Sequence, residues 1–340
     1  MTPLVTVGIP SYNHAAYLPH AIESVLGQTL TDVELVIADD GSTDGSLEIA
    51  QRYAAAHPGR VTVLTHPGQA HRGTAATGNL HRSHASGRFL LALGSDDALH
   101  PDALERGVEY LEARPETGFV YGYAHRIDGA GRPLPGARRF GGDVTAGGRA
   151  VERLVQGNKV PFMTALFRRE CVERAGPEHE EVVYADWELL VRIAAHCEVG
   201  FIPRVLAVQR VHGANTSVTA SRETNVGRAW EVTAVLRERA RAVGGRLAEP
   251  RVLAVLELQT AFLGFASERD DGTDGAVRLA FEHDPELRHD ARWLADWVWD
   301  RIVDELLPHD GPLLVDWLEP RLAPLLDGTA LGRLERELRA

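Results

Sequence analysis

The sequence predicts an α/β fold with a mostly parallel central sheet, followed by a helical region toward the C-terminal end. Short apolar, β-branched runs alternate with segments whose apolar residues recur at helical spacing. Strands that alternate with helices imply a parallel sheet covered on both faces. Beyond about Arg222 the strand patterns fade and amphipathic helical patterns replace them.

The expected elements of the first part follow one another in a regular order. The runs that predict strands are 4–9, 33–38, 61–64, 89–93 and 119–123. The helices expected between them are 18–26, 46–56 and 74–85. Another helix is expected to begin at Pro101, because proline suits the first helical turn. This order is typical of repeated β-α-β units.

The middle of the chain continues the pattern after an interruption. A stretch rich in Gly, Arg and Pro at 128–148 predicts a connection, to which we assign no fixed structure. Apolar segments at 162–167 and 205–211 then flank an expected helix at 187–196.

Composition and charge exclude several classes of protein. Hydrophobic residues make up 44% of the chain and charged residues 25%, which is typical of a folded globular protein. The net charge of -12 argues against binding to nucleic acid or an anionic membrane, because both need clustered cations. The two cysteines, Cys171 and Cys197, argue against a disulfide scaffold or a structural zinc site. No apolar stretch approaches the ~20 residues that span a bilayer, so we expect a cytoplasmic protein without a transmembrane segment.

Polar residues gather where the predicted strands end, which is where ligands bind in an open parallel sheet. We therefore regard the residues that follow these strands as candidates for a common ligand site. The segments are Pro10-Ser11-Tyr12-Asn13 after the first strand, 39–44 after the second, 94–97 after the strand at 89–93, and the acidic segment 185–188.

Two aspartates stand side by side at Asp96 and Asp97. Their charges repel each other, and such crowding persists when a cation or the hydrogen-bond donors of a ligand compensate it. Carboxylate oxygens suit Mg²⁺ or Mn²⁺, which also bridge diphosphate oxygens, so the pair is a candidate metal site. Alternatively, one aspartate caps the helix expected near Pro101 and the other is solvated.

A second acidic pair, Asp39 and Asp40, follows the second strand. An ionised aspartate at a strand end can accept the imide N–H of a pyrimidine base, and we favour Asp39 for this role, with Asp40 as the alternative. The same segment also has a local interpretation. Asp44 or Ser46 can cap the next helix and Gly41 can form a turn, and both interpretations can hold together.

These motifs, taken in order, resemble those of family-2 glycosyltransferases with the GT-A fold. The matching segments are Pro10-Ser11-Tyr12-Asn13, 23–29, 39–44 and Ser95-Asp96-Asp97. Each motif is weak alone, but their order and separation make the combination specific, and the resemblance covers roughly residues 4 to 217.

The resemblance implies that a nucleotide diphosphate sugar lies across the first half of the sheet. Pro10 and Tyr12 would line the base and ribose pocket, and Asp39 would bind the base. The other residues that the resemblance assigns to donor binding are Asn13, Asp40, Arg72, Asn79, Ser95, Asp96 and Arg210. Asp97, Asp96 and His212 would hold a divalent metal, Mn²⁺ or Mg²⁺. The chain departs from the family where Gly94 replaces the first aspartate of an Asp-x-Asp-Asp motif, which leaves open whether Asp96 or Asp97 is the main ligand.

Asp186 matches the family's later acidic motif, in which an aspartate is the general base. The glutamate that usually precedes it is Ala185 here. Asp186 could instead cap a helix that starts at Trp187. The segment 210–217 resembles the family's C-terminal Arg-x-His segment, in which arginine and histidine approach the metal and the diphosphate.

The sequence therefore predicts an inverting glycosyltransferase with a catalytic domain at 1–221 and a helical domain at 222–340 that binds an acceptor or forms a homodimer. The donor would be a UDP- or dTDP-sugar, and the acceptor a saccharide, a lipid-linked intermediate, a natural product or a peptide. One alternative is a nucleotide-sugar-binding module without turnover. Another is a sugar nucleotidylyltransferase, but such an enzyme normally needs a Gly-rich basic loop after its first strand, where this chain has Pro10-Ser11-Tyr12-Asn13. A dehydrogenase is disfavoured because no GxGxxG motif follows that strand.

Overall fold

We describe the protein from a computed structural model. The described residues are 2–134, 141–145, 148–213, 215, 222–243, 245–266, 273–304 and 320–326. The chain divides into two compact units, Met1–Thr219 and Ala220–Ala340, and each is described by itself.

The first unit is built on an eight-stranded sheet with the order β3-β2-β1-β4-β7-β6-β8-β5. Neighbours from β3 to β4 are parallel, β6 is parallel to β8, and β7 and β5 run antiparallel to their neighbours. The strands are β1 (Val5–Ser11), β2 (Val33–Asp39), β3 (Val61–Thr65), β4 (Phe89–Ala92), β5 (Ala98–Leu99), β6 (Thr117–Asp128), β7 (Leu166–Arg168) and β8 (Glu198–Val211). The predicted α/β class with a mostly parallel sheet is confirmed.

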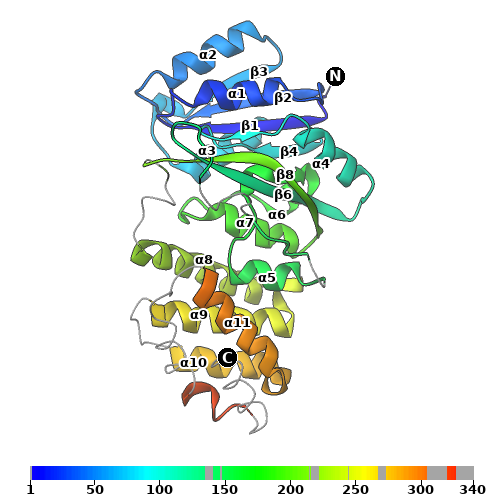
Figure 1. Cartoon of the computed structure of the whole chain (residues 1–340), viewed down its shortest axis with the longest axis vertical. Coiled ribbons are helices and arrows are strands. Elements are labelled where there is room, and N and C mark those ends of the chain that lie inside the picture. The colour runs from blue at the N-terminus through cyan, green and yellow to red at the C-terminus, as the bar shows by residue number, and fades with distance from the viewer. Residues whose placement is uncertain are drawn as a thin grey trace. The chain divides into compact units, whose positions relative to one another are not determined.

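The described part of the first unit also contains seven α-helices. They are α1 (Leu18–Leu26), α2 (Ser46–Ala56), α3 (Thr74–His84), α4 (Ala103–Glu112), α5 (Ala150–Gln156), α6 (Arg169–Ala175) and α7 (Ala185–Ala194). Figure 1 shows α1 running alongside β1 and β2. The apolar stripe of α1, which includes Leu18, Ile22 and Val25, is fully buried in one core with Val7 and Ile9 of β1.

The opposite face of β1 packs against α3 at very close range. Side chains alternate between the two faces of a strand, so Gly8 faces away from the core that contains Val7 and Ile9. A Cβ atom on Gly8 would lie 2.1 Å from Nδ1 of His81, a buried residue of α3. Glycine at this position therefore lets the histidine ring rest directly on the strand.

Most of the expected elements are present, with shifted ends. The helix expected from Pro101 begins at Ala103. The strand expected at 119–123 extends to Asp128, because β6 pairs with β8 along its whole length. The segment 162–167 splits into a 3-10 turn, Phe162–Thr164, and the short strand β7. Part of the predicted connection at 128–148 lies outside the described residues.

The second unit is helical throughout its described residues. Its helices are α8 (Arg222–Val243), α9 (Pro250–Ala266), α10 (Thr273–His283) and α11 (Ala291–Asp304). Leu258 and Phe262 of α9 meet Phe281 of α10 and Leu294 and Trp297 of α11 in a common core. Within the described parts of the chain, no helix is both long and apolar enough to cross a membrane.

Candidate active site

The loop after β1 is joined to the loop after β2 through Asn13. Its side-chain Oδ1 accepts a hydrogen bond from the backbone N–H of Thr43 at 2.8 Å, and its own N–H donates to Ser42 Oγ at 3.0 Å. Asn13 adopts a left-handed backbone conformation with φ of 51°, which asparagine tolerates better than most residues. The paired loops therefore form one rim at the carboxyl ends of β1 and β2.

Asp39 ends β2 beneath this rim and is 1% exposed. Its Oδ2 accepts hydrogen bonds from the N–H groups of Gly41 at 3.1 Å and Ser42 at 2.9 Å. Its Oδ1 is buried and has no hydrogen-bond partner among the described residues, and the same is true of Ser11 Oγ. Ser11 and Asp39 are register partners in adjacent parallel strands, so the two side chains lie on the same face of the sheet.

Asp40 differs from Asp39 because both of its carboxylate oxygens bind protein groups. Oδ1 accepts from the N–H of Arg72 at 2.7 Å, and Oδ2 accepts from the N–H of Gly73 at 2.9 Å. Nδ1 of His71 also lies 2.9 Å from Oδ2. Asp40 thus holds the loop before α3, and the local geometry favours Asp39 over Asp40 as the group available to a base.

An aromatic pair stands at the exposed side of the same rim. The rings of Tyr12 and His71 are stacked, with centroids 4.1 Å apart, and Tyr12 is 42% exposed. Pro10 is half-buried at the end of β1, and Arg72 next to His71 is exposed. His71 and Arg72 also contact Asp40, so the aromatic pair lies next to the residue that follows Asp39.

Asn79 lies on α3 and is bound elsewhere. Its Nδ2 donates to the carbonyl oxygen of Glu178 at 3.0 Å and to Glu180 Oε1 at 3.2 Å. Its Oδ1 accepts from the N–H of Glu178 at 2.8 Å and from Arg82 Nη2 at 2.7 Å. The side-chain amide of Asn79 therefore positions the segment before α7. The resemblance implied that Asn79 binds the donor, but the contacts described here do not join it to the loops after β1 and β2.

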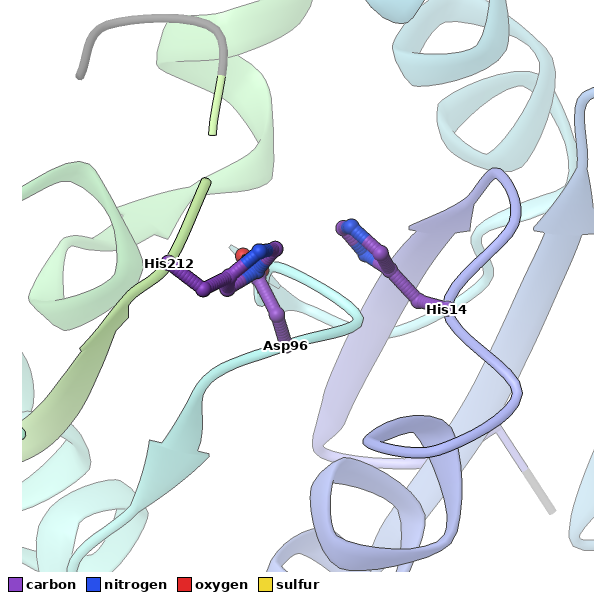
Figure 2. A group of neighbouring side chains, drawn as sticks. All are labelled: His14, Asp96 and His212. Atoms are coloured by element: carbon purple, nitrogen blue, oxygen red, sulfur yellow. The ribbon is translucent and has the colours of Figure 1, made fainter. Parts of the chain in front are cut away.

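The candidate metal centre consists of His14, Asp96 and His212, whose ligand atoms all lie within 4.8 Å of one another. Figure 2 shows the three side chains converging from the loop after β1, the loop after β4 and the end of β8. His212 Nε2 is 3.0 Å from Asp96 Oδ2, which also accepts from Asn215 Nδ2 at 2.8 Å. His14 Nδ1 lies 2.8 Å from Ser95 Oγ.

His14 is the member of this group that the sequence analysis missed. It directly follows the motif at 10–13 and thus stands at the carboxyl end of β1. Since β1 and β4 are parallel neighbours, residues after both strands meet at one edge of the sheet. The sequence signal for His14 was its position directly after the first predicted strand, whereas the pairing of β1 with β4 came from the structure.

Asp97 lies outside the group of three. Its side chain is 7% exposed, and its Oδ1 accepts the backbone N–H of Arg210 at 2.9 Å. Burial, followed by the charge of Asp96, raises the pKa of the Asp97 carboxyl well above its ordinary value. Asp97 thereby connects the metal loop to β8, while Asp96 and His212 of the predicted metal set remain together.

Gly94 has a steric explanation in this loop. A Cβ atom at position 94 would lie 2.7 Å from Asp97 Oδ2 and 2.9 Å from Asp96 Oδ1. Any side chain here would have to displace the two carboxylates. The departure from the family motif therefore leaves room for the carboxylates of Asp96 and Asp97.

Arg210 is fixed by several contacts around this loop. Its Nε donates to the carbonyl oxygen of Asp96 at 3.1 Å, and its guanidinium lies 4.9 Å from the ring centroid of Tyr17. The same ring lies 4.8 Å from that of His212, so Tyr17 packs against both residues. Residues 214, 216 and 217 of the predicted motif lie outside the described residues.

Asp186 is the second residue of α7, so it lies inside the helix and is not its cap. The N-cap residue is Tyr184, which makes no side-chain capping bond. Burial, reinforced by the negative charge of Glu178, raises the pKa of Asp186 to about 6. A carboxylate with this pKa is ionised at neutral pH and is a stronger proton acceptor than an ordinary aspartate.

Glu178 is the other group that the sequence analysis missed. It is 8% exposed, and its Oε1 lies 2.5 Å from Nη1 of Arg82 in a buried ion pair. It also packs over α3, since a Cβ atom on Gly78 would lie 3.2 Å from Glu178 Oε1. No motif marks Glu178, because its neighbours Gly78 and Arg82 are about a hundred residues away in the sequence.

The chain is similar in sequence to known glycosyltransferases. The family model described as glycosyl transferase family 2 matches residues 6–174. An uncharacterized glycosyltransferase of Nostoc sp. is 30% identical over 226 residues, which cover 65% of this chain and 69% of that protein. A PGL/p-HBAD biosynthesis glycosyltransferase of Mycobacterium tuberculosis is 31% identical over 192 residues, which cover 56% of this chain and 69% of that one. The chain spans only 18% of the Escherichia coli chondroitin synthase that it also matches, at 38% identity over 38% of this chain.

Solved structures show the same fold. The structure of Staphylococcus aureus TarS 1-349 in complex with UDP-GlcNAc has a TM-score of 0.60 at 16% identity, covering 99% of this chain and 90% of that chain. The mannosyltransferase PcManGT of Pyrobaculum calidifontis, in complex with GDP-Man and Mn²⁺, has a TM-score of 0.57 at 20% identity, covering 99% and 86%. The ordered motifs, the sheet and these relatives agree. The chain has the GT-A fold and belongs to glycosyltransferase family 2, whose members are enzymes that transfer sugars from nucleotide sugars.

Proposed function

We propose that the protein transfers a sugar from a UDP- or dTDP-sugar to an acceptor nucleophile by a single, inverting displacement. One observation carries this proposal. Asn13 and His14 are adjacent, and the first binds the loop that follows Asp39 while the second joins Ser95 and the group around Asp96. The candidate base site and the candidate metal site are therefore two ends of one continuous rim.

The base of the donor would bind at Asp39. An uncompensated carboxylate oxygen in a buried position is costly, and a ligand N–H that reaches it would restore the hydrogen bond. The imide N–H of uracil or thymine has the right polarity for Oδ1. Tyr12 and His71 supply a flat aromatic surface, and Pro10, Asn13 and Arg72 border the same rim.

A divalent metal would be held by His14, Asp96 and His212. The set combines one carboxylate oxygen with two imidazole nitrogens, which suits Mn²⁺ better than Mg²⁺, because Mg²⁺ prefers oxygen ligands. Asp97 stays behind this group on the backbone of Arg210. When bound, such a cation neutralises the negative charge that develops on a departing diphosphate. The proposed ligand set thus differs from the predicted one in a single residue, because His14 replaces Asp97.

Asp186 would act as the general base. Its carboxylate removes the proton from the acceptor hydroxyl as the acceptor oxygen attacks the anomeric carbon, and the bond from that carbon to the diphosphate oxygen breaks. One displacement inverts the configuration at this carbon. Arg82 and Asn79 would position Asp186 indirectly, because they bind Glu178 in the segment that leads into α7.

The alternative is a module that binds nucleotide sugars without turnover, and Gly94 and Ala185 are the two features that favour it. Incubation of the full chain with Mn²⁺ and a panel of UDP- and dTDP-sugars separates the two functions. We expect slow hydrolysis of at least one donor, and the Asp186→Asn variant should bind that donor equally well but hydrolyse none. Binding of a donor without hydrolysis under all conditions would favour the module.

We further propose that 1–221 is the catalytic domain and that the helical domain, 222–340, contributes acceptor binding or a dimer contact. The helical unit has its own core, which includes Phe262 and Trp297, so it can fold around these residues as a body distinct from the sheet. Sedimentation velocity at micromolar concentration tests the dimer. A single species with the mass of one chain would leave acceptor binding as the remaining role.

A further inference from the structure

The two cysteines meet in the interior of the first unit. Cys171 belongs to α6, Cys197 immediately precedes β8, and each is 7% exposed. Their Sγ atoms are 2.6 Å apart, compared with about 2.05 Å for a covalent sulfur–sulfur bond. The two sulfur atoms are not joined in a disulfide in this structure. Only a small movement separates this arrangement from a bonded one.

A glycine of the neighbouring strand makes this approach possible. A Cβ atom on Gly118 of β6 would lie 2.3 Å from Cys197 Cβ and 3.2 Å from Cys171 Sγ. Any larger residue at position 118 would overlap with Cys197, so that the cysteine would have to move. The pair also stands at the start of β8, whereas Arg210 lies near its other end, so the thiols are remote along the strand from the metal loop.

The thiols differ in reactivity. The hydrogen bond between the sulfur atoms lowers the pKa of Cys197 to about 7, while that of Cys171 rises. A thiolate is the nucleophile in thiol–disulfide exchange. The pair can therefore begin the exchange at Cys197, and Cys171, whose Sγ atom is 2.6 Å away, is placed to resolve the product.

We propose that Cys171 and Cys197 are a modification site, at which a reversible disulfide closes the intervening segment, including α7 and Asp186, into a covalent loop. The co-reactant is a low-molecular-weight disulfide. The Cys197 thiolate attacks one of its sulfurs and releases one thiol; Cys171 then loses its proton, attacks Cys197 of the mixed disulfide and releases the second thiol. Two protein thiols are oxidised and one small disulfide is reduced to two thiols.

The closed segment is already held by the buried apolar side chains of α7 and by polar contacts. Arg82 binds Glu178, and Arg192 donates to the carbonyl oxygen of Pro177 at 2.8 Å and to that of Ala175. These contacts all break when the segment unfolds. A disulfide between residues 26 positions apart restricts the unfolded chain instead, so it stabilises the segment by a separate mechanism.

Peptide mapping tests the bond on the full chain. The protein is equilibrated with oxidised glutathione, its remaining thiols are alkylated, and it is digested with trypsin without reduction. Cleavage after arginine places Cys171 in peptide 170–174 and Cys197 in peptide 193–204. We expect these peptides joined, with two hydrogen atoms lost. Alkylated thiols only, or separate glutathione adducts only, would overturn the proposal.

Thermal unfolding tests the effect of the bond. Oxidised wild-type protein should melt about 5 °C or more above the same protein after reduction, as expected for closing a loop of this length. Cys171→Ser and Cys197→Ser, taken through the same treatment, should show no joined peptide and no rise. Because oxidised and reduced wild type are compared directly, an effect of serine on folding does not obscure the result. A bond that forms without raising the melting temperature would overturn the stabilising role.

Discussion

His212 Nε2 lies 3.0 Å from Asp96 Oδ2, although 116 positions separate the two residues in the sequence. His14, in the loop after the carboxyl end of β1, completes the group. If this group holds the metal, removing either histidine should weaken Mn²⁺ binding by about tenfold or more, because each supplies one of three protein ligands. Titration of His14→Ala and His212→Ala by electron paramagnetic resonance of free Mn²⁺ measures this. The exposed His84, on α3, provides the control variant His84→Ala, and equal affinity in all variants would exclude the group.

Replacement of Asp39 by Asn should weaken binding of UDP about tenfold or more. The substitution removes the charged acceptor Oδ1 that we assign to the base, and charge-assisted hydrogen bonds contribute about 1.5–3 kcal/mol. Isothermal titration calorimetry measures the affinity, and Mn²⁺ binding should stay unchanged. Asp32→Asn, at the exposed approach to β2, is the control. An unaltered UDP affinity in a folded Asp39→Asn protein would contradict the assignment.

The rate of transfer or donor hydrolysis should fall as the pH drops through about 6. Asp186 has a pKa raised to about 6, and the general base works only when deprotonated, so the active fraction is lost below that value. Glu178→Gln removes a negative charge that raises this pKa, so the acidic limb of the pH–rate profile should move to lower pH. Burial, the larger cause, remains in the variant and keeps the pKa above the ordinary range.

Glu180→Gln is the matched control for this shift, because Glu180 is exposed and, within the described part of the chain, its carboxylate accepts a hydrogen bond from Asn79. Its profile should match that of the wild type. Asp186→Asn should be inactive at every pH. An acidic limb that stays in place in Glu178→Gln, with the activity of Asp186→Asn abolished, would mean that Asp186 is the base but that Glu178 does not tune it.

Gly94→Ala should reduce Mn²⁺ affinity without unfolding the protein. The new Cβ atom would lie under 3.0 Å from carboxylate oxygens of both Asp96 and Asp97, so at least one carboxylate must move. Gly213→Ala is a close control, because nothing lies within 4 Å of its Cβ position. The comparison of Mn²⁺ affinity in the two variants shows whether metal binding depends on the absence of a side chain at position 94. Equal affinities would show that the carboxylates have room to adapt.

Gly8→Ala should destabilise the first unit by about 1–3 kcal/mol or more, because the added methyl group overlaps the ring of His81. Urea denaturation followed by circular dichroism measures the free energy of unfolding. In the His81→Ala background the same substitution should cost much less, since the overlapping ring is gone. An equal cost in both backgrounds would place the strain elsewhere.

Much of the fold follows from local patterns. The strand at Val33–Asp39 and the helix at Ser46–Ala56 have the apolar spacing that their buried faces require, and the structure confirms both within a residue. Helix α4 begins two residues later than the pattern at Pro101 indicated, because the ends of helices depend on which backbone groups find partners in the tertiary structure.

The candidate site divides in the same way. The sequence alone was sufficient for the family, the α/β class and the acidic residues at strand ends, because these depend on residue types in a fixed order. The sequence already favoured Asp39 over Asp40, but only the tertiary structure supplied a physical reason, because the loop at 72–73 binds both oxygens of Asp40. The tertiary structure likewise brought His14 to Asp96, Glu178 to Arg82, and Cys171 to Cys197. Such contacts join residues that are distant in the chain, and a local pattern carries no information about the distance between side chains that only the folded sheet brings together.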